Sequence, residues 1–183
     1  MRLFVAVFPP PEVREEASRT ARRLLPDDRI RWSRPGNVHL TLKFLGGVDE
    51  ERLDELRTVL EDACAAHAPF EARLAGLGAF PSARRARIIW AGAGAGSEQL
   101  RSLAADVDAA LSYSGFERET RPYEPHLTLG RVRGRPVSLD LPKEADDGLL
   151  FEVRRIELTE STLTDKGPVY RTIEDFVLFD EKS

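Results

Sequence analysis

The chain has 183 residues, of which 42 % are hydrophobic and 32 % are charged, a composition typical of a soluble globular protein with a substantial core. Its formal net charge of −4 argues against broad, charge-driven binding to duplex nucleic acid, although a local basic cleft can still capture one nucleotide end. Met1-Arg2 leads directly into a strand-like segment, no apolar run approaches the ~20 residues of a membrane span, and the single Cys64 permits no internal disulfide. We therefore expect a cytoplasmic protein with no membrane partner.

The first third of the chain predicts a strand, a helix and a second strand. Residues 3–8 form a short apolar run ended by Pro9-Pro10-Pro11, which indicates a strand buried on both faces. Residues 12–25 predict a helix and residues 30–32 a short strand. The helix has a basic face that we interpret as solvated surface, made of Arg14, Arg19, Arg22 and Arg23.

A repeated pattern follows, which reads R-P-x-x-x-H-L-T-L at residues 34–42 and again at residues 121–129. Each copy predicts a strand for two reasons. Thr is β-branched, and polar residues alternate with apolar ones. Residues i and i+2 of a strand point to the same face, so His39 and Thr41 share one face while the leucines share the other. Two of the three histidines in the chain occupy this frame, which favours a shared chemical task over two half-exposed surface strands.

Between the two copies the hydrophobic pattern predicts a helix, two strands and another helix, at residues 50–65, 70–80, 86–91 and 97–112. The third histidine, His67, follows the first of these helices and is interpreted as a surface or capping residue. Residues 92–96 read Gly-Ala-Gly-Ala-Gly, which lacks the G-x-G-x-x-G spacing of a dinucleotide loop. We interpret this stretch as a flexible turn closed by Ser97 as a helix cap.

After the second copy, residues 133–147 are rich in Gly, Pro and charge and predict a loop. Residues 151–162 and 169–179 alternate in polarity around a short turn, and this pattern predicts a β-hairpin. Long strands that return through short turns, with helices between them, indicate an α+β protein with antiparallel sheets and helices outside.

The paired His strands suit acid–base chemistry on a phosphate. A histidine titrates near pH 6.5, so at neutral pH His39 and His126 can supply one general base and one general acid. The hydroxyls of Thr41 and Thr128 can hydrogen-bond phosphoryl oxygens beside their histidines. The reaction that fits these groups is the opening of a strained phosphodiester by water.

These motifs resemble the paired H-x-[ST]-x motifs of the two-histidine (2H) phosphoesterase superfamily, and within it the LigT/ThpR family of RNA 2′,3′-cyclic phosphodiesterases, also called 2′-5′ RNA ligases. The resemblance extends over essentially the whole chain. Its four stretches are Arg2-Leu3-Phe4-Val5-Ala6-Val7, Asn37-Val38-His39-Leu40-Thr41-Leu42-Lys43-Phe44-Leu45-Gly46, Pro125-His126-Leu127-Thr128-Leu129-Gly130-Arg131, and Glu160-Ser161 with Gly167-Pro168-Val169-Tyr170.

The resemblance implies a bilobal fold with a pseudo-twofold axis, in which two antiparallel sheets line a central cleft and the helices lie outside. Residues 1–183 would form one domain of two intertwined lobes. The resemblance also suggests that Arg131 holds a phosphate oxygen, although strict alternation along the strand puts it on the face opposite His126. Phe8 either packs in the core or lines the cleft and stacks on a base. Tyr170 either touches substrate or packs.

The resemblance further implies hydrolysis of a 2′,3′-cyclic phosphate at an RNA or oligonucleotide 3′ end, or on a small cyclic nucleotide, to a 2′-phosphate, without a metal or other cofactor. We assign His126 as the base that activates water and His39 as the acid that protonates the 3′ oxygen. The roles exchange when the reaction runs backward as a 2′-5′ ligation. We expect the protein to act as a monomer.

Two other classes stay open at this point. One is a module that binds 2′-phosphorylated or cyclic nucleotide ends without turning them over, although pure binding needs no acid–base pair. The other is a protein that binds a metal through His39 and His126, although the H-x-T frame supplies no further ligand. The physiological substrate, the cellular importance of ligation and the oligomeric state are not determined by these motifs.

Overall fold

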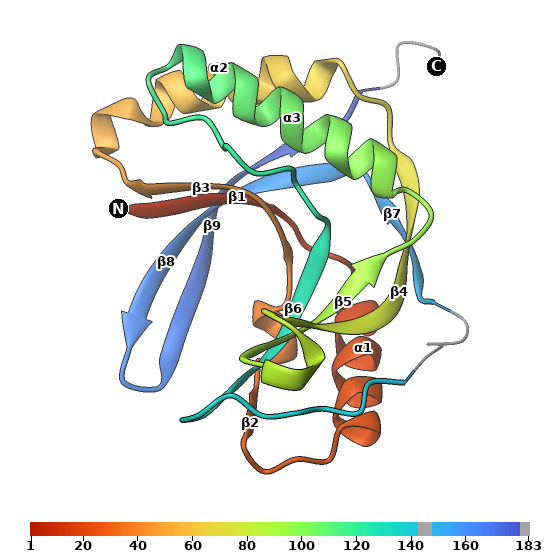
Figure 1. Ribbon diagram of the computed structural model, residues 1–183. Helices are drawn as coiled ribbons and strands as arrows, with labels where there is room; N and C mark the ends of the chain where they lie inside the picture. The colour runs from red at the N-terminus through yellow and green to blue at the C-terminus, as the bar shows by residue number, and fades with distance from the viewer. Residues whose placement is uncertain (143–147, 180–183) are drawn as a thin grey trace.

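The chain folds into an α+β protein in which a long, curled antiparallel sheet is flanked by helices (Figure 1). The computed structural model describes residues 1–142 and 148–179. Its strands are β1 (Arg2–Val7), β2 (Ile30–Trp32), β3 (Leu40–Gly47), β4 (Phe70–Phe80), β5 (Ile88–Ala93), β6 (His126–Val132), β7 (Leu150–Val153), β8 (Arg155–Thr164) and β9 (Gly167–Val177). Its α-helices are α1 (Pro11–Leu24), α2 (Leu53–Ala65) and α3 (Ser97–Tyr113), and its 3₁₀ turns are η1 (Pro35–Asn37), η2 (Glu50–Arg52) and η3 (Ala83–Arg85).

The sheet has two halves that meet in the middle of the molecule. The strand order is β7-β4-β5-β6-β3-β1-β8-β9, with β2 paired to β6 at the side of this path. One half contains β2 and β4 to β7, and the other contains β1, β3, β8 and β9. One registered pair, Leu40 with Leu127, joins β3 to β6. The two sheets expected from the sequence are therefore two halves of one sheet, joined where the two copies of the repeat meet.

The junction has a local twofold relation that follows from the repeat. Leu40 and Leu127 occupy the same position in the two copies and face each other as an antiparallel pair. An antiparallel pair of equivalent residues has a twofold axis between its members, so the histidines that precede them, His39 and His126, are related by the same axis. The two His strands are thus brought together through their equivalent residues.

Both His strands also contain a bulge at the same place in the motif. In β3 the register passes from Ala6 opposite Thr41 to Val5 opposite Lys43, so Leu42 has no partner in β1. In β6 it passes from Trp90 opposite Thr128 to Ile89 opposite Gly130, so Leu129 has no partner in β5. An extra residue in one strand shifts the alternation of every residue that follows it.

The strand expected at residues 151–162 is divided into two elements. β7 pairs with β4 in one half, whereas β8 pairs with β1 in the other half, and Arg154 lies between them. The chain therefore crosses from one half to the other at this residue. The expected hairpin is present, because β8 and β9 pair along their whole length. Of the loop expected at residues 133–147, residues 143–147 lie outside the described part of the chain.

The core fills the face of the sheet opposite the histidines. Leu40, Leu42, Leu127 and Leu129 are each at most 4 % exposed and belong to one hydrophobic cluster. Helix α1 lies against the half that contains β6, and α2 and α3 lie against the other half near β9 and β3 (Figure 1).

The glycine-rich turn before α3 has a packing explanation. Gly96, not Ser97, caps the helix, and its φ of 80° lies in the left-handed region. A Cβ at Gly96 would lie 2.5 Å from the carbonyl oxygen of Glu71. Glycine is required there by backbone contact with β4, so the turn serves the packing of α3 and the expected Ser97 cap is wrong. Within the described residues, no helix is long and apolar enough to cross a membrane.

Candidate active site

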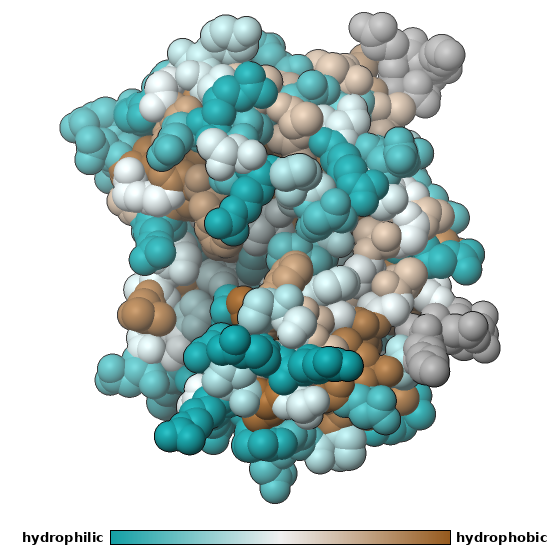
Figure 2. Space-filling view, viewed as in Figure 1, coloured by the Kyte–Doolittle hydropathy of each residue, from teal (hydrophilic) through white to brown (hydrophobic). Residues whose placement is uncertain are grey.

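His39 and His126 stand at the start of the two central strands. His39 immediately precedes β3 and His126 is the first residue of β6. The charge of His126 contributes to lowering the pKa of His39. Figure 2 shows a depression between the two halves of the molecule on the side where these strands meet.

The two rings are anchored in the same way. Nδ1 of His39 lies 2.7 Å from the carbonyl oxygen of Asn37, and Nδ1 of His126 lies 2.7 Å from that of Glu124. A carbonyl oxygen only accepts, so Nδ1 carries the hydrogen in both rings. The neutral form of each ring therefore has its lone pair on Nε2, where it can accept a proton, and the charged form can donate one from the same atom.

The surroundings of the two rings differ. The His39 ring is packed by Phe4 at 4.8 Å, Phe8 at 5.0 Å and Tyr170 at 5.2 Å between ring centroids. Burial lowers the pKa of His39 to about 4, with further lowering from the charges of Arg14 and His126, while the Asn37 carbonyl opposes the shift. His39 is thus neutral in the free protein at neutral pH.

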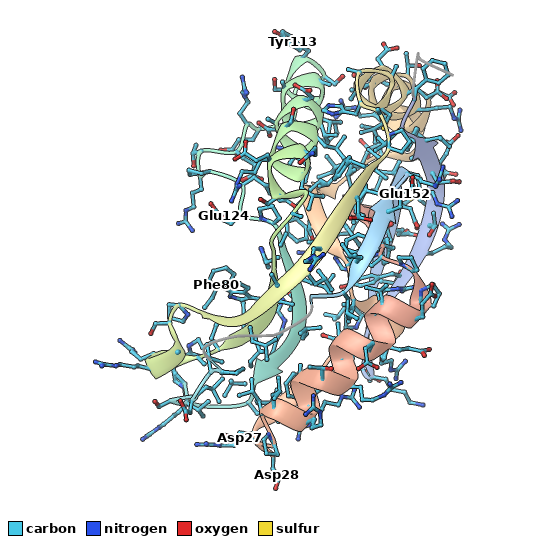
Figure 3. The ribbon with its side chains drawn as sticks, turned by 90° about the vertical axis from the view of Figure 1, so that its right-hand side faces the viewer. Asp27, Asp28, Phe80, Tyr113, Glu124 and Glu152 are labelled. Carbon is cyan, nitrogen blue, oxygen red and sulfur yellow. The ribbon has the colours of Figure 1, made fainter. Side chains whose placement is uncertain are left out.

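The His126 ring has an aromatic neighbourhood of its own on β4 and β5. Phe80 lies 5.2 Å from it edge-on and Trp90 lies 6.4 Å away between centroids. Phe80 is exposed and projects from the same side of the sheet as the segment that carries Glu124 (Figure 3). Trp90 lies flat over Gly78, where a Cβ would come within 2.1 Å of the indole ring. Both rings are therefore available as a stacking surface beside His126.

The threonines keep the position that alternation predicted. Thr41 and Thr128 follow their histidines by two residues within β3 and β6, before the bulge in each strand, so each shares the face of its histidine. Both are half-buried. Their expected contact with phosphoryl oxygens stays a prediction.

Arg131 lies on the cleft side because of the bulge. Leu129 and Gly130 are both buried, and the alternation resumes one residue late, so the exposed Arg131 returns to the face of His126. Its charge also lowers the pKa of Tyr170, although burial of the Tyr170 hydroxyl outweighs this and raises the pKa overall. The expectation from strict alternation is therefore wrong, and Arg131 and Tyr170 lie on the same side as the histidines.

Comparison with known proteins agrees with this site. Residues 9–165 match the model of the 2′-5′ RNA ligase superfamily. The chain belongs to the 2′-5′ RNA ligase superfamily. Proteins named RNA 2′,3′-cyclic phosphodiesterase from Methanocaldococcus jannaschii and Aquifex aeolicus are 35 % and 31 % identical to it, over 96 % and 97 % of this chain and 100 % and 97 % of theirs.

Solved structures of superfamily members have the same fold. TT0787 of Thermus thermophilus matches with a TM-score of 0.86 and 34 % identity, over 99 % of this chain and 100 % of that one. LigT of E. coli in complex with 3′-AMP matches with a TM-score of 0.81 and 25 % identity, over 98 % of each chain. The bilobal α+β fold expected from the sequence is thereby confirmed.

The surroundings of the two histidines include residues that the sequence pattern did not reveal. Arg14 of α1 donates from Nη1 to the Gly36 carbonyl at 2.8 Å and lies 5.7 Å from the centroid of the Phe8 ring. Asn37 donates from Nδ2 to the Pro168 carbonyl at 2.9 Å, which fixes the β8–β9 hairpin beside His39. Arg14 belongs to the basic face that the sequence suggested was solvated, and no local signal distinguishes it from the other arginines there.

Three further observations concern the surroundings of the histidines. The Phe8 ring packs against His39, and its stacking on a base stays a prediction. In residues 1–142 and 148–179, no three His, Cys, Asp or Glu side chains are grouped so that they could hold a metal ion. His67 is separate from the site and pairs through Nε2 with Asp106 of α3 at 2.8 Å.

Proposed function

We propose that this protein is an RNA 2′,3′-cyclic phosphodiesterase that hydrolyses a terminal 2′,3′-cyclic phosphate to a 2′-phosphate, with His39 and His126 as its acid–base pair. The main support for the proposal is that the two imidazole rings are held by equivalent hydrogen bonds. Each Nδ1 is bound to a backbone carbonyl two residues upstream, which leaves both Nε2 atoms for proton transfer. The activity in the names of relatives that span nearly the whole chain supports the same reaction.

In the hydrolysis, one ring removes a proton from water as its oxygen attacks phosphorus. The P–O3′ bond breaks, and the other ring donates its proton to the 3′ oxygen, so the product has a 3′-hydroxyl and a 2′-phosphate. The hydroxyls of Thr41 and Thr128 donate to the non-bridging oxygens, where negative charge accumulates. Arg131 holds a phosphate oxygen from the same face. With a 5′-hydroxyl in place of water, the same displacement of the 3′ oxygen forms a 2′-5′ linkage, and its reversal forms the cyclic phosphate again.

The assignment of roles keeps His126 as the base and His39 as the acid. Because the pKa of His39 is lowered to about 4 in the free protein, His39 can donate only after the phosphate of the substrate has raised that pKa. A 3′-thio analogue of the cyclic phosphate tests this order, because a thiolate leaves without a proton. We expect His39→Ala to regain most of the rate on the thio substrate and His126→Ala to regain little. The opposite result would exchange the two roles.

The proposal includes a monomer that acts on RNA 3′ ends and small cyclic nucleotides in the cytoplasm. Both histidines and both threonines come from one chain, so a single copy contains the acid–base pair. The one cysteine is a buried thiol on α2, which suits a reducing compartment.

The deciding experiment is hydrolysis of a short RNA that ends in a 2′,3′-cyclic phosphate, in the presence of a chelator. We expect His39→Ala and His126→Ala each to lower kcat by ~10²- to 10⁴-fold, the usual contribution of a general acid or base. His67→Ala is the matched control, because it removes the remaining histidine, which pairs with Asp106 of α3 away from the two His strands, and it should keep the wild-type rate. A 3′-phosphate product, or a wild-type rate in either site variant, would refute the proposed mechanism.

A further inference from the structure

Positive charge is concentrated in three segments of the half that contains β6. Residues 29–39, 81–92 and 126–139 contain no Asp or Glu, although the whole chain has a net charge of −4. Their nine arginines are Arg29, Arg31, Arg34, Arg84, Arg85, Arg87, Arg131, Arg133 and Arg135. The segments are neighbours in space, because β6 pairs with both β2 and β5 and Ala86 bridges to Val137.

Most of these arginines are not neutralised within the described part of the chain. Among residues 1–142 and 148–179, Arg29 is the one member of this group within 4.0 Å of a carboxylate, that of Asp27. Most surface arginines elsewhere on the protein form ion pairs, for example Arg155 with Asp175 and Arg171 with Glu160. The half that contains β6 therefore keeps its positive charge available to an outside partner.

Three members of this group are neighbours at the end of β6 remote from His126, and we name Arg31, Arg131 and Arg133 the arginine stripe. The bulge at Leu129 returns Arg131 to the face of His126. Arg31 of β2 is the direct cross-strand partner of Arg131, so the two side chains share a face. Arg133 follows Arg131 by two residues and is exposed, so it continues the same face.

The spacing of the stripe suits a chain of phosphates. Residues two apart on a strand are separated by ~7 Å, which is comparable to the separation of successive phosphates in a single strand. Within the part of the chain that the structure describes, Arg31 donates one side-chain hydrogen bond, from Nη2 to the carbonyl oxygen of Lys166 at 3.2 Å, and its other guanidinium donors have no partner there. Guanidinium groups bind phosphate oxygens through paired N–H donors.

We propose that the arginine stripe is a binding site for the phosphodiester backbone of RNA on the 5′ side of the cyclic phosphate, so that the protein selects polynucleotides over mononucleotides. The inference rests on the proposed function, which puts the terminal phosphate between His39 and His126. A chain that ends in a cyclic phosphate can extend only through its 5′ phosphate. The arginine stripe lies on the same face as the histidines, so its guanidinium groups can bind the phosphates of the RNA chain on the 5′ side of the cyclic phosphate.

The first test compares kcat/KM for a mononucleotide 2′,3′-cyclic phosphate with that for an octaribonucleotide ending in the same group. In the wild type the octamer should be preferred, and the Arg31→Gln/Arg133→Gln variant should lower the octamer-to-mononucleotide ratio by about tenfold, mainly through KM. Arg23→Gln is the matched control. It removes the same charge from an exposed position on α1, which lies on the other side of the sheet (Figure 3), and should keep the wild-type ratio.

The second test measures binding without turnover, so that it stays informative if the hydrolysis proposed above is wrong. Fluorescence anisotropy of a labelled octamer with a terminal 2′-phosphate gives log Kd against log salt. Loss of two phosphate contacts should reduce the slope by about 1.4 in the double variant, at ~0.7 per contact for single strands. Equal slopes and affinities in the wild type and the double variant would overturn the arginine stripe, whereas loss of turnover alone would count only against the proposed reaction.

Discussion

At the scale of single residues, His39 and His126 occupy equivalent positions in one motif but differ in their surroundings. Three aromatic rings enclose His39, and burial, followed by the charges of Arg14 and His126, lowers its pKa to about 4. The proposed reaction needs one protonated ring and one neutral ring, whichever of the two donates the proton. Activity is therefore lost at low pH when both rings are protonated. We therefore expect the acidic limb of the kcat/KM profile near pH 4, well below the ordinary value of 6.5 for histidine.

The position of this limb should respond to Arg14. Removing the guanidinium in Arg14→Gln relieves repulsion of the protonated His39 ring, so its pKa should rise and the acidic limb should move to higher pH. Arg19→Gln removes the same charge from an exposed position on α1 and should leave the limb in place. An NMR titration of the His39 ring measures the same shift directly. An unmoved limb in Arg14→Gln would show that burial alone lowers this pKa.

The lowered pKa of His39 also affects stability. Between pH 6.5 and pH 4 the unfolded chain binds more protons at this ring than the folded chain, so the free energy of unfolding falls as the pH falls through this window. A difference of this size corresponds to about 3 kcal/mol at most. His39→Gln should remove this part of the slope, as measured by urea unfolding at pH 4.5 and pH 7. Parallel pH dependence in the wild type and the variant would contradict the expected linkage.

At the scale of elements, a buried ion pair between β3 and α3 also binds residues 117–119, which precede the second His strand. Nζ of Lys43, on β3, lies 2.5 Å from Asp108 Oδ1 on α3 and also donates to the Glu117 carbonyl oxygen. The amide of Glu119 donates to the same carboxylate at 3.1 Å. Lys43→Met would leave the buried Asp108 carboxylate with the exposed Arg118, whose Nε lies 3.4 Å from Oδ2, as its cationic partner among the described residues. We expect a loss of about 3–5 kcal/mol in the free energy of unfolding, measured with urea.

A matched control for this element is an exposed pair. Arg155→Met removes the partner of Asp175 at the surface, and it should cost less than about 1 kcal/mol because water screens such pairs. The double variant Lys43→Met/Asp108→Leu, which removes both buried charges, should recover part of the stability lost in Lys43→Met. Equal small losses in Lys43→Met and Arg155→Met would show that the buried pair has no structural role.

At the scale of the whole molecule, the two halves are joined by more than the central pair. Helix α3 contacts β3 of one half and β4 of the other, and the chain crosses between the halves at Arg154. We expect one cooperative unfolding transition. Both tryptophans, Trp32 and Trp90, lie in the half that contains β6, whereas the buried thiol of Cys64 lies on α2 beside the other half. Tryptophan fluorescence and thiol labelling should give the same urea midpoint, and labelling at a lower urea concentration would indicate two independent units.

The sequence by itself determined the family and much of the fold. Two His–Thr frames with leucines on the alternate positions predict two strands with one polar face each, because alternation is local. The helices, the β8–β9 hairpin and the family resemblance followed from patterns of the same kind. The tertiary structure decided which half each strand joins, the side on which Arg131 lies and the burial of His39. The bulge depends on register against β5, and the pKa of His39 depends on Arg14, Phe8 and Tyr170, which pack against it from distant segments. These relations between segments remote in sequence have no local signature.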